Sequence, residues 1–140
     1  MRRFFILLGF WAILRPAQAT IDDAITSALF ALDQYTKQGY IVRDDQWGGD
    51  LGLREQKAIP HTLFRGNDYW FCMATDLENA RVAIHLYDSR GKLAESDSWQ
   101  SGRFAAARIL PLATGTFYII VEVTASPKER TTWAMVYGYK

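Results

Sequence analysis

The chain after Gly39 is divided into short runs of β-branched and aromatic residues, which glycine, aspartate, asparagine and proline separate. Such runs are typical of strands joined by tight turns, and about eight of them follow one another at a spacing of roughly ten residues. Strands of this length and spacing form two packed antiparallel sheets. The sequence therefore predicts a mainly β fold, an antiparallel β-sandwich of the jelly-roll-like kind.

The run TGTFYIIVEV, residues 114–123, is the most apolar part of the second half of the chain. It contains Glu122 and is too short for a membrane-spanning helix, so a core strand is the better interpretation. Side chains alternate along a strand, and the predicted inward row comprises Phe117, Ile119, Val121 and Val123. Tyr118 and Ile120 belong to the opposite row, which is too apolar for a bare solvent face. We expect the N-terminal helix, or else a partner, to cover them.

We expect residues 20–38 to form the one long helix of the chain. Thr20 is suited to cap its first turn, Asp23 follows at capping-box spacing, and Gly39 is placed to end it. Apolar side chains recur at helical spacing, namely Ile21, Ile25, Ala28, Leu29, Leu32 and Tyr35. One face of the helix must therefore pack, either on its own sandwich or on another chain.

The first nineteen residues have the three parts of a secretory signal peptide. Arg2 and Arg3 precede an apolar run, residues 4–14, that is too short to span a bilayer as a helix. Ala17 and Ala19 then form the small-residue pattern that a signal peptidase accepts. We expect cleavage at the end of residues 1–19, an uncleaved N-terminal anchor being the alternative.

With residues 1–19 removed, residues 20–140 are expected to form one domain, secreted or periplasmic, without a stable membrane span. The removal of three arginines changes the formal charge from +1 to −2. This balance argues against a nucleic-acid partner, because binding to phosphates needs a surplus of lysine and arginine. Cys72 is the only cysteine, so no intramolecular disulfide is expected, and its apolar neighbours predict a buried side chain.

Four stretches within roughly residues 60–140 form a recognisable series, namely LFRGNDYWFCMAT, RVAIHLYDSRGKLAESDS, ATGTFYIIVEV and WAMVYGY. Together they resemble the bacterial pre-peptidase C-terminal domain, a PPC-like domain. That family has a glycine before an aromatic strand, a hairpin with a glycine in its turn, a strand of the tGtYyi kind and a closing aromatic strand. The resemblance implies a small jelly-roll-like β-sandwich with an accessory, targeting or binding role in an exported protein.

Residues that could carry chemistry are few and scattered. His61 and His85 are the only histidines, and they lie on different predicted strands without a metal-binding motif around them. A small secreted hydrolase would use one of them with a nearby carboxylate such as Asp88. The sequence has no Gly-x-Ser-x-Gly motif and no phosphate-binding glycine loop, so we expect no cofactor.

Asp44, Asp45 and Asp50 lie close together in the sequence and are the candidates for a metal site. Their spacing lacks the regular pattern of oxygen ligands that a calcium loop has. A solvated loop without a metal ion is therefore the favoured interpretation.

Trp47, Trp99 and Tyr118 are the candidates for ligand binding. Both tryptophans lie in predicted loops, the first beside two glycines and the second among serines. Flat rings on loops or on an outer strand row can stack on sugars or anchor a protein interface. The alternative is that the tryptophans fold back onto the core.

Three classes of function remain open. The first, which the lack of a catalytic motif favours, is an exported non-catalytic β-sandwich module that binds a partner protein, a glycan or an envelope component. The second is a small secreted hydrolase that uses His61 or His85. The third is an inhibitor or subunit that docks on another chain through the helix face of Ile25, Leu29 and Leu32.

Overall fold

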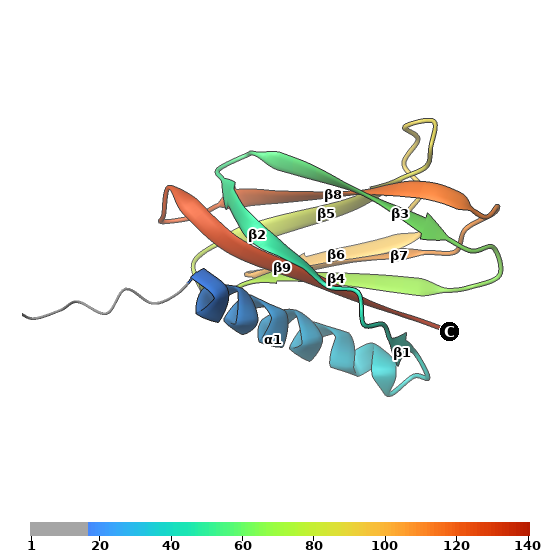
Figure 1. Ribbon diagram of the computed structural model, residues 1–140, viewed down its shortest axis with the longest axis horizontal. Helices are drawn as coiled ribbons and strands as arrows, with labels where there is room; N and C mark the ends of the chain where they lie inside the picture. The colour runs from blue at the N-terminus through green and yellow to red at the C-terminus, as the bar shows by residue number, and fades with distance from the viewer. Residues whose placement is uncertain (1–16) are drawn as a thin grey trace, which may run out of the picture.

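A computed structural model describes residues 17–140, which form one helix and nine strands (Figure 1). The predicted fold class is confirmed, because the described chain is mainly β, with one helix and two antiparallel sheets. Most of the predicted signal peptide lies outside the described residues, so its cleavage and the limits of the mature domain stay predictions. The elements are α1 (Ala17–Thr36), β1 (Ile41–Val42), β2 (Trp47–Gly52), β3 (Gln56–Leu63), β4 (Tyr69–Thr75), β5 (Arg81–Tyr87), β6 (Asp97–Ser101), β7 (Phe104–Ile109), β8 (Gly115–Ala125) and β9 (Arg130–Tyr139).

The strands form two sheets that face each other across one core. Sheet A has the order β1-β9-β4-β7-β6, and β2 follows β1 along the same edge of β9. Sheet B has the order β3-β8-β5. Alternate residues of β8 are buried, as the strand period of two predicts. The buried row is the predicted one, with Phe117, Ile119, Val121 and Val123.

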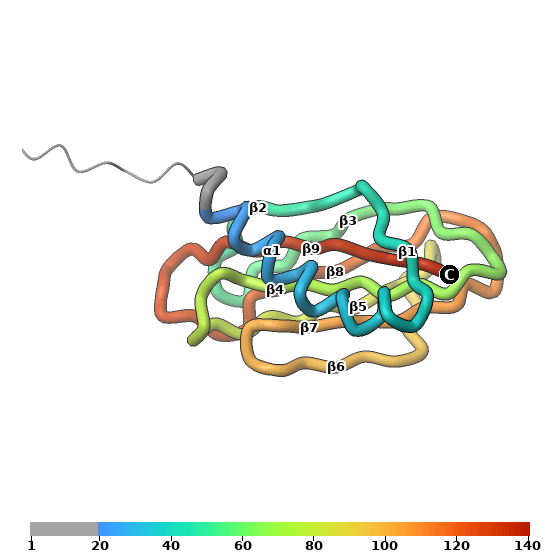
Figure 2. Tube along the Cα trace, turned by 90° about the horizontal axis from the view of Figure 1, so that it is seen from below, coloured from blue at the N-terminus to red at the C-terminus, as the bar shows by residue number. Residues whose placement is uncertain are grey.

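Helix α1 covers the outer face of sheet A, where it crosses β9 and β4 (Figure 2). The approach is close because small residues meet, with Ala28 of the helix in one buried cluster with Cys72 and Ala106 of the sheet. Sheet A is therefore covered on both faces, which is why every residue of β4 is buried. Leu32 and Ile25 also pack here, so the helix face proposed for docking on another chain contacts the chain's own sheet.

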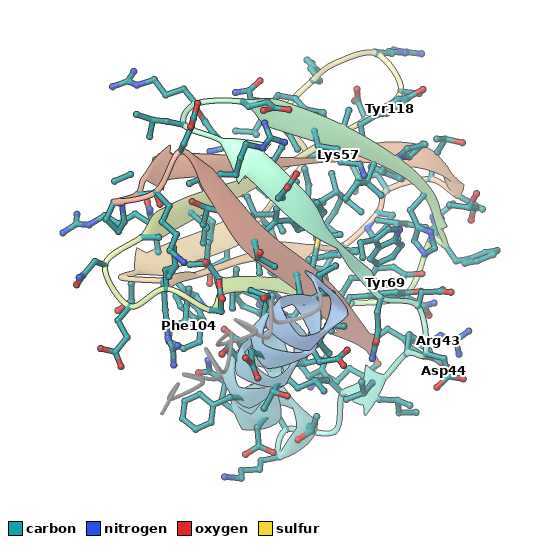
Figure 3. The ribbon with its side chains drawn as sticks, turned by 60° about the vertical axis from the view of Figure 1, so that its left-hand side comes forward. Arg43, Asp44, Lys57, Tyr69, Phe104 and Tyr118 are labelled. Carbon is teal, nitrogen blue, oxygen red and sulfur yellow. The ribbon has the colours of Figure 1, made fainter. Side chains whose placement is uncertain are left out.

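The prediction that the helix covers Tyr118 and Ile120 is wrong. Both side chains lie on the outer face of sheet B, and Figure 3 shows Tyr118 on the opposite side of the sandwich from α1. Tyr118 is 38% exposed and lies in one row with Pro60 and Tyr87 of the neighbouring strands. The helix packs instead where small side chains of sheet A allow close contact, a preference that strand periodicity alone does not reveal.

The helix begins and ends earlier than the sequence predicts. It starts at Ala17, so Thr20 lies inside the helix and does not cap it. Alanine is a strong helix former, and the alanines that precede Thr20 continue the helix backwards. The last helical residue is Thr36, and Gly39 closes the following turn with a φ of +98°, which favours glycine. Among the described residues, no helix is long and apolar enough to cross a membrane.

Two stretches that the sequence predicts as loops are strands. Residues 47–52 form β2, because the glycines in this stretch allow close packing and do not form turns. A Cβ atom on Gly48 would lie 3.0 Å from the side chain of Ile21 in the helix. Residues 97–101 form β6, the polar edge strand of sheet A. An edge strand is exposed along one side and can carry polar residues, so it lacks the apolar run that marks a central strand.

The connections between strands gather at two ends of the sandwich. The C-terminal end consists of residues 43–46, 64–68, 88–96 and 110–114 together with Lys140. The hairpin end consists of residues 53–55, 76–80, 102–103 and 126–129. In Figure 1 the C-terminal end lies on the right, and the loop of residues 88–96 rises above sheet B there.

Asp68 ties the C-terminal end together. The guanidinium of Arg108 donates two hydrogen bonds to this carboxylate, at 2.6 and 2.9 Å, and the hydroxyl of Tyr40 donates a third at 2.7 Å. Asp68 and Lys140 also exchange two backbone hydrogen bonds. Burial acts to raise the pKa of Asp68, but the bonds from Arg108 and Tyr40 outweigh it and the pKa is lowered. The carboxylate therefore stays ionised and links four segments of the chain.

Candidate functional site

A cleft of about 350 Å³ opens at the C-terminal end, where the ends of β3 and β9 and the start of β4 meet residues 43–45. Its volume lies near the lower end of the range of small-molecule sites. Figure 3 shows Arg43 and Tyr69 on the same side of the molecule. We call it the tyrosine cleft, and it is lined by Arg43, Asp45, His61, Thr62, Phe64, Asn67, Tyr69, Tyr137 and Tyr139.

The cleft exists because the edge strand beside β9 is interrupted. Both β1 and β2 pair with β9, and residues 43–46 leave the edge between them. Aspartate is disfavoured in strands, and this segment contains two aspartates in a row. The amide of Arg43 still donates to the carbonyl of Tyr137 at 3.0 Å, which fixes where the segment departs. His61 of sheet B reaches the same opening from the other side.

Three polar side chains meet at the hydroxyl of Tyr137. This hydroxyl lies 3.0 Å from Nε2 of His61 and donates to the carboxylate of Asp45 at 3.2 Å. Arg43 interacts electrostatically with the same hydroxyl, and its guanidinium lies 5.3 Å from the ring centroid of Tyr139. A buried tyrosine thus positions one cationic, one anionic and one imidazole group around a single opening.

Burial determines the charge of these groups. It lowers the pKa of His61 below the ordinary 6.5 despite the nearby carboxylate of Asp45, so the imidazole is neutral near neutral pH. Burial also raises the pKa of Tyr137, which keeps its proton. Arg43 and Asp45 carry opposite charges. The lining of the tyrosine cleft therefore has no net charge near neutral pH.

A second hollow of about 540 Å³ lies at the same end, between residues 88–94 and residues 109–117. Three leucines on these loops are exposed: Leu112 by 92%, Leu93 by 59% and Leu110 by 46%. Grouped exposed apolar side chains are uncommon on a monomer and are typical of a binding surface. We call this hollow with its three leucines the leucine groove.

Basic side chains border the leucine groove. Arg90 and Lys92 line it, and Arg65 lies on the neighbouring loop, where its amide donates to the hydroxyl of Thr114 at 3.0 Å. Asp88 also lines the groove, but its carboxylate accepts the amides of Arg90 and Lys92 and closes the turn of its own loop. The rim of the groove therefore carries a surplus of positive charge.

The two tryptophans singled out from the sequence lie on opposite faces of sheet A. Trp47 packs against the sandwich core behind the tyrosine cleft, edge-on to His61 with ring centroids 5.2 Å apart. Trp99 packs against α1, and its Nε1 donates to the hydroxyl of Tyr35 at 2.8 Å. Tyr118 stands apart from both on sheet B. The three rings do not form one exposed platform, and a role for each in ligand binding stays a prediction.

The two histidines lie apart in the structure. Nδ1 of His85 is 2.8 Å from a carboxylate oxygen of Glu95, while Asp88, the carboxylate expected beside it, belongs to the neighbouring turn. His61 shares the tyrosine cleft with Asp45, whose carboxylate is 4.0 Å from Nε2. Among the described residues that line this cleft there is no serine or cysteine, the usual nucleophiles of histidine-dependent hydrolases.

The three aspartates proposed as weak metal candidates do not converge. Asp45 belongs to the tyrosine cleft, whereas Asp50 on β2 forms an ion pair with Arg130 at 2.7 Å. Asp44 lies beside Arg43 at the surface (Figure 3). In the described part of the chain, no three histidine, cysteine, aspartate or glutamate side chains are grouped closely enough to hold a metal ion.

Sequence reasoning did not single out Tyr137, Asn67 or the leucines as site residues. One available signal was the row of tyrosines in the last strand, because a buried tyrosine hydroxyl needs a polar partner. Another was Leu110-Pro-Leu112, which sets two large apolar residues next to a proline that ends a strand. Neither signal identifies the partner residues, which come from distant parts of the chain.

Comparison with known proteins gives a weak structural likeness. No protein-family model matches the chain, and no curated protein matches it. The crystal structure of Aeromonas hydrophila PliG, a periplasmic lysozyme inhibitor of g-type lysozyme, is similar with a TM-score of 0.49 and 13% sequence identity. The likeness covers 74% of this chain and 90% of that chain. A likeness of this degree transfers no partner or activity to this chain, so function has to be inferred from its own residues.

Proposed function

We propose that residues 20–140 act as an exported, non-catalytic β-sandwich module that binds a partner protein at the leucine groove. The observation that carries this proposal is the exposure of Leu93, Leu110 and Leu112 on two neighbouring loops. Full burial of a leucine side chain contributes about 2 kcal/mol, so three leucines can support a specific complex. Export rests on the predicted signal peptide, and the resemblance to a PPC-like domain, also a prediction, agrees with an accessory binding role.

The charges around the groove indicate the kind of partner surface that fits. Arg65, Arg90 and Lys92 are exposed at or beside its rim. A partner with apolar side chains flanked by carboxylates would match both the leucines and this positive rim, and opposite charges would speed its association. The expected partner is therefore an exported protein with an acidic, partly apolar contact surface.

A binding role is favoured over hydrolysis because of what surrounds His61. The hydroxyl of Tyr137 lies between this histidine and Asp45, and His61 has no described serine or cysteine beside it in the cleft. A histidine that activates a nucleophile must be within hydrogen-bond reach of it. The residues in the tyrosine cleft are better suited to hold a ligand than to cleave one.

Site-specific photo-cross-linking in the producing cells tests the partner-binding proposal. A photoreactive amino acid at position 112 is expected to give one discrete adduct with another protein, and the same residue at position 53 none. Leu53 is a matched control because it is also an exposed leucine, at 55%, but lies at the hairpin end. The proposal would be contradicted by equal amounts of adduct from both positions or by no adduct from position 112. An adduct formed only with a second copy of this chain would also contradict it.

The cross-linked partner, once purified, allows a direct measurement. Leu112→Asp should weaken binding at least about tenfold, because a carboxylate would enter an apolar contact. Leu53→Asp should leave the affinity unchanged. Charge reversal of Arg90 and Lys92 to glutamate should slow association and reduce its dependence on salt.

A further inference from the structure

The tyrosine cleft has a composition that packing alone does not explain. Its lining consists of four aromatic rings and five polar side chains, and none of these residues is a leucine, isoleucine, valine or methionine. Gaps that result only from imperfect packing are lined by the aliphatic side chains of the core. Here, polar groups surround an opening whose rim includes Phe64, a ring that is 55% exposed. Such a mixture is typical of a site for a small polar ligand.

The charges of the cleft exclude most charged ligands. An anion would approach Arg43 but would also meet the carboxylate of Asp45, which is held nearby by the hydroxyl of Tyr137. A cation would be attracted by Asp45 but repelled by Arg43. His61 adds no charge near neutral pH, because burial lowers its pKa. The electrostatic environment therefore favours a neutral ligand.

The polar atoms favour a ligand that carries several hydroxyl groups. Asn67 lines the cleft and donates one hydrogen bond to the hydroxyl of Tyr69, at 3.1 Å, and its amide oxygen is a hydrogen-bond acceptor. Asp45 provides a further acceptor, and the guanidinium of Arg43 provides planar pairs of donors. A purely apolar ligand would leave these groups without partners, at a cost in free energy.

The rings of the cleft are not arranged to clamp a flat aromatic ligand. The ring planes of His61 and Tyr137 are inclined by 73°, and those of Tyr69 and Tyr137 by 39°. No parallel pair of rings therefore encloses a slot between these three residues. Single ring faces, such as that of the exposed Phe64, suit a puckered ring whose C–H groups pack on the negative face of the aromatic system.

We infer that the tyrosine cleft is a binding site for a neutral sugar ring, a pyranose of a glycan. In this site Phe64 packs against the apolar face of the sugar, and Arg43, Asp45 and Asn67 bind its hydroxyl groups. Tyr137 acts as a positioning residue, because its buried hydroxyl donates a hydrogen bond to Asp45. The cleft and the leucine groove use different side chains, so this inference does not depend on the proposed protein partner.

A defined panel of oligosaccharides tests the inference. The neutral probes are the trisaccharides of glucose, mannose, galactose and N-acetylglucosamine, and the charged probes are tri-galacturonate and the trisaccharide of glucosamine. Binding is measured by calorimetry and by tryptophan fluorescence, since Trp47 contacts His61 behind the cleft. At least one neutral probe should bind, whereas the charged probes and the nucleoside adenosine should not. No binding of any neutral probe at about 10 mM, or preference for a charged probe, overturns the inference.

Exposed residues of the cleft allow variants that leave the fold intact. Phe64→Ala and Arg43→Ala should each weaken binding of the neutral probe at least about tenfold. Asp45→Asn keeps a planar hydrogen-bonding group and should retain most of the binding, whereas Asp45→Ala should lose it. Leu53→Ala is the matched control and should bind the sugar as the unaltered chain does. Unchanged sugar binding by both Phe64→Ala and Arg43→Ala would place the sugar elsewhere and contradict the inference.

Discussion

The two ends of the sandwich differ in what they expose and in how they are held. The C-terminal end exposes Leu93, Leu110 and Leu112, and the buried carboxylate of Asp68 ties its segments together. The hairpin end exposes mostly polar and charged side chains, with Leu53 as its one large exposed apolar residue among those described.

The ion pairs at the two ends also differ in how far their side chains are exposed to solvent. The side chains of Asp68 and Arg108 are 13% and 36% exposed, whereas those of Asp50 and Arg130 at the hairpin end are 58% and 51% exposed. A surface that binds a partner gains affinity when its loops are already ordered before binding. Apolar exposure and internal anchoring therefore occur together at one end, which is the combination a binding surface requires.

The largest difference between the ends should appear on removal of the two carboxylates. Asp68→Ala should lower the free energy of unfolding by about 3 kcal/mol, because Arg108 and Tyr40 both lose a charged acceptor in a buried setting. Urea denaturation followed by circular dichroism measures this loss. If Asp68→Ala were no more destabilising than Asp50→Ala, the anchoring of the C-terminal end would be disproved.

Acid should weaken the C-terminal end through the same residue. The folded pKa of Asp68 is lower than its ordinary value of 3.8, so the stability it contributes is fully present above that value. It is lost as the pH falls through the lower, folded pKa. The unfolding free energies of the unaltered chain and of Asp68→Asn should therefore differ most near neutral pH and converge below pH 3.8. A difference that stays constant across this range would contradict the pairing.

A smaller loss of stability is expected when the hydroxyl at the centre of the tyrosine cleft is removed. Tyr137→Phe keeps the ring stacked on Phe71 at a centroid distance of 4.9 Å but removes the bonds to Asp45 and His61. The loss of stability should be about 1 kcal/mol. The imidazole signals of His61 in the NMR spectrum should shift as well. Tyr118→Phe, at an exposed hydroxyl on sheet B, is the control and should change neither quantity.

The smallest effect is expected at the hairpin end. Asp50→Ala breaks an ion pair with Arg130 whose two side chains are more than half exposed. Exposed pairs contribute about 0.5 kcal/mol or less, and salt screens them. The same denaturation measurement, repeated in high salt, should show no difference from the unaltered chain. A loss as large as that of Tyr137→Phe would show that the hairpin end is anchored too.

The strands with regular alternation could be predicted because their pattern is local. The buried row of β8 follows from a period of two along a single run of residues. The strands β2 and β6 could not be predicted in this way. In β2, a glycine is needed at position 48 because Ile21 of the helix approaches closely. In β6, polar residues are allowed because the strand lies at the edge of the sheet. Both reasons refer to neighbours that are distant in the sequence.

Even less of the candidate site could be predicted from the sequence, because its residues come from distant parts of the chain. His61 was identified as one of two histidines, and Asp45 as one of three aspartates, but their common contact with Tyr137 joins residues up to 92 positions apart. The two aspartates in residues 43–46 disfavour a strand, but nothing in the sequence indicates that the interruption lies beside Tyr137. Trp47 and Trp99 both fall in stretches that the sequence predicts as loops, yet they lie on opposite faces of one sheet.

The fold class, the inward row of β8 and the glycine that closes the turn after the helix can be predicted from the sequence, because each depends on residues close together in the chain. The folded chain alone shows which sheet the helix covers, where the two hollows lie and which charges meet inside them. These features depend on the close approach of small side chains and on one interrupted edge strand. Packing depends on two surfaces that meet in space, and the local sequence pattern of one surface does not show which other surface it will contact.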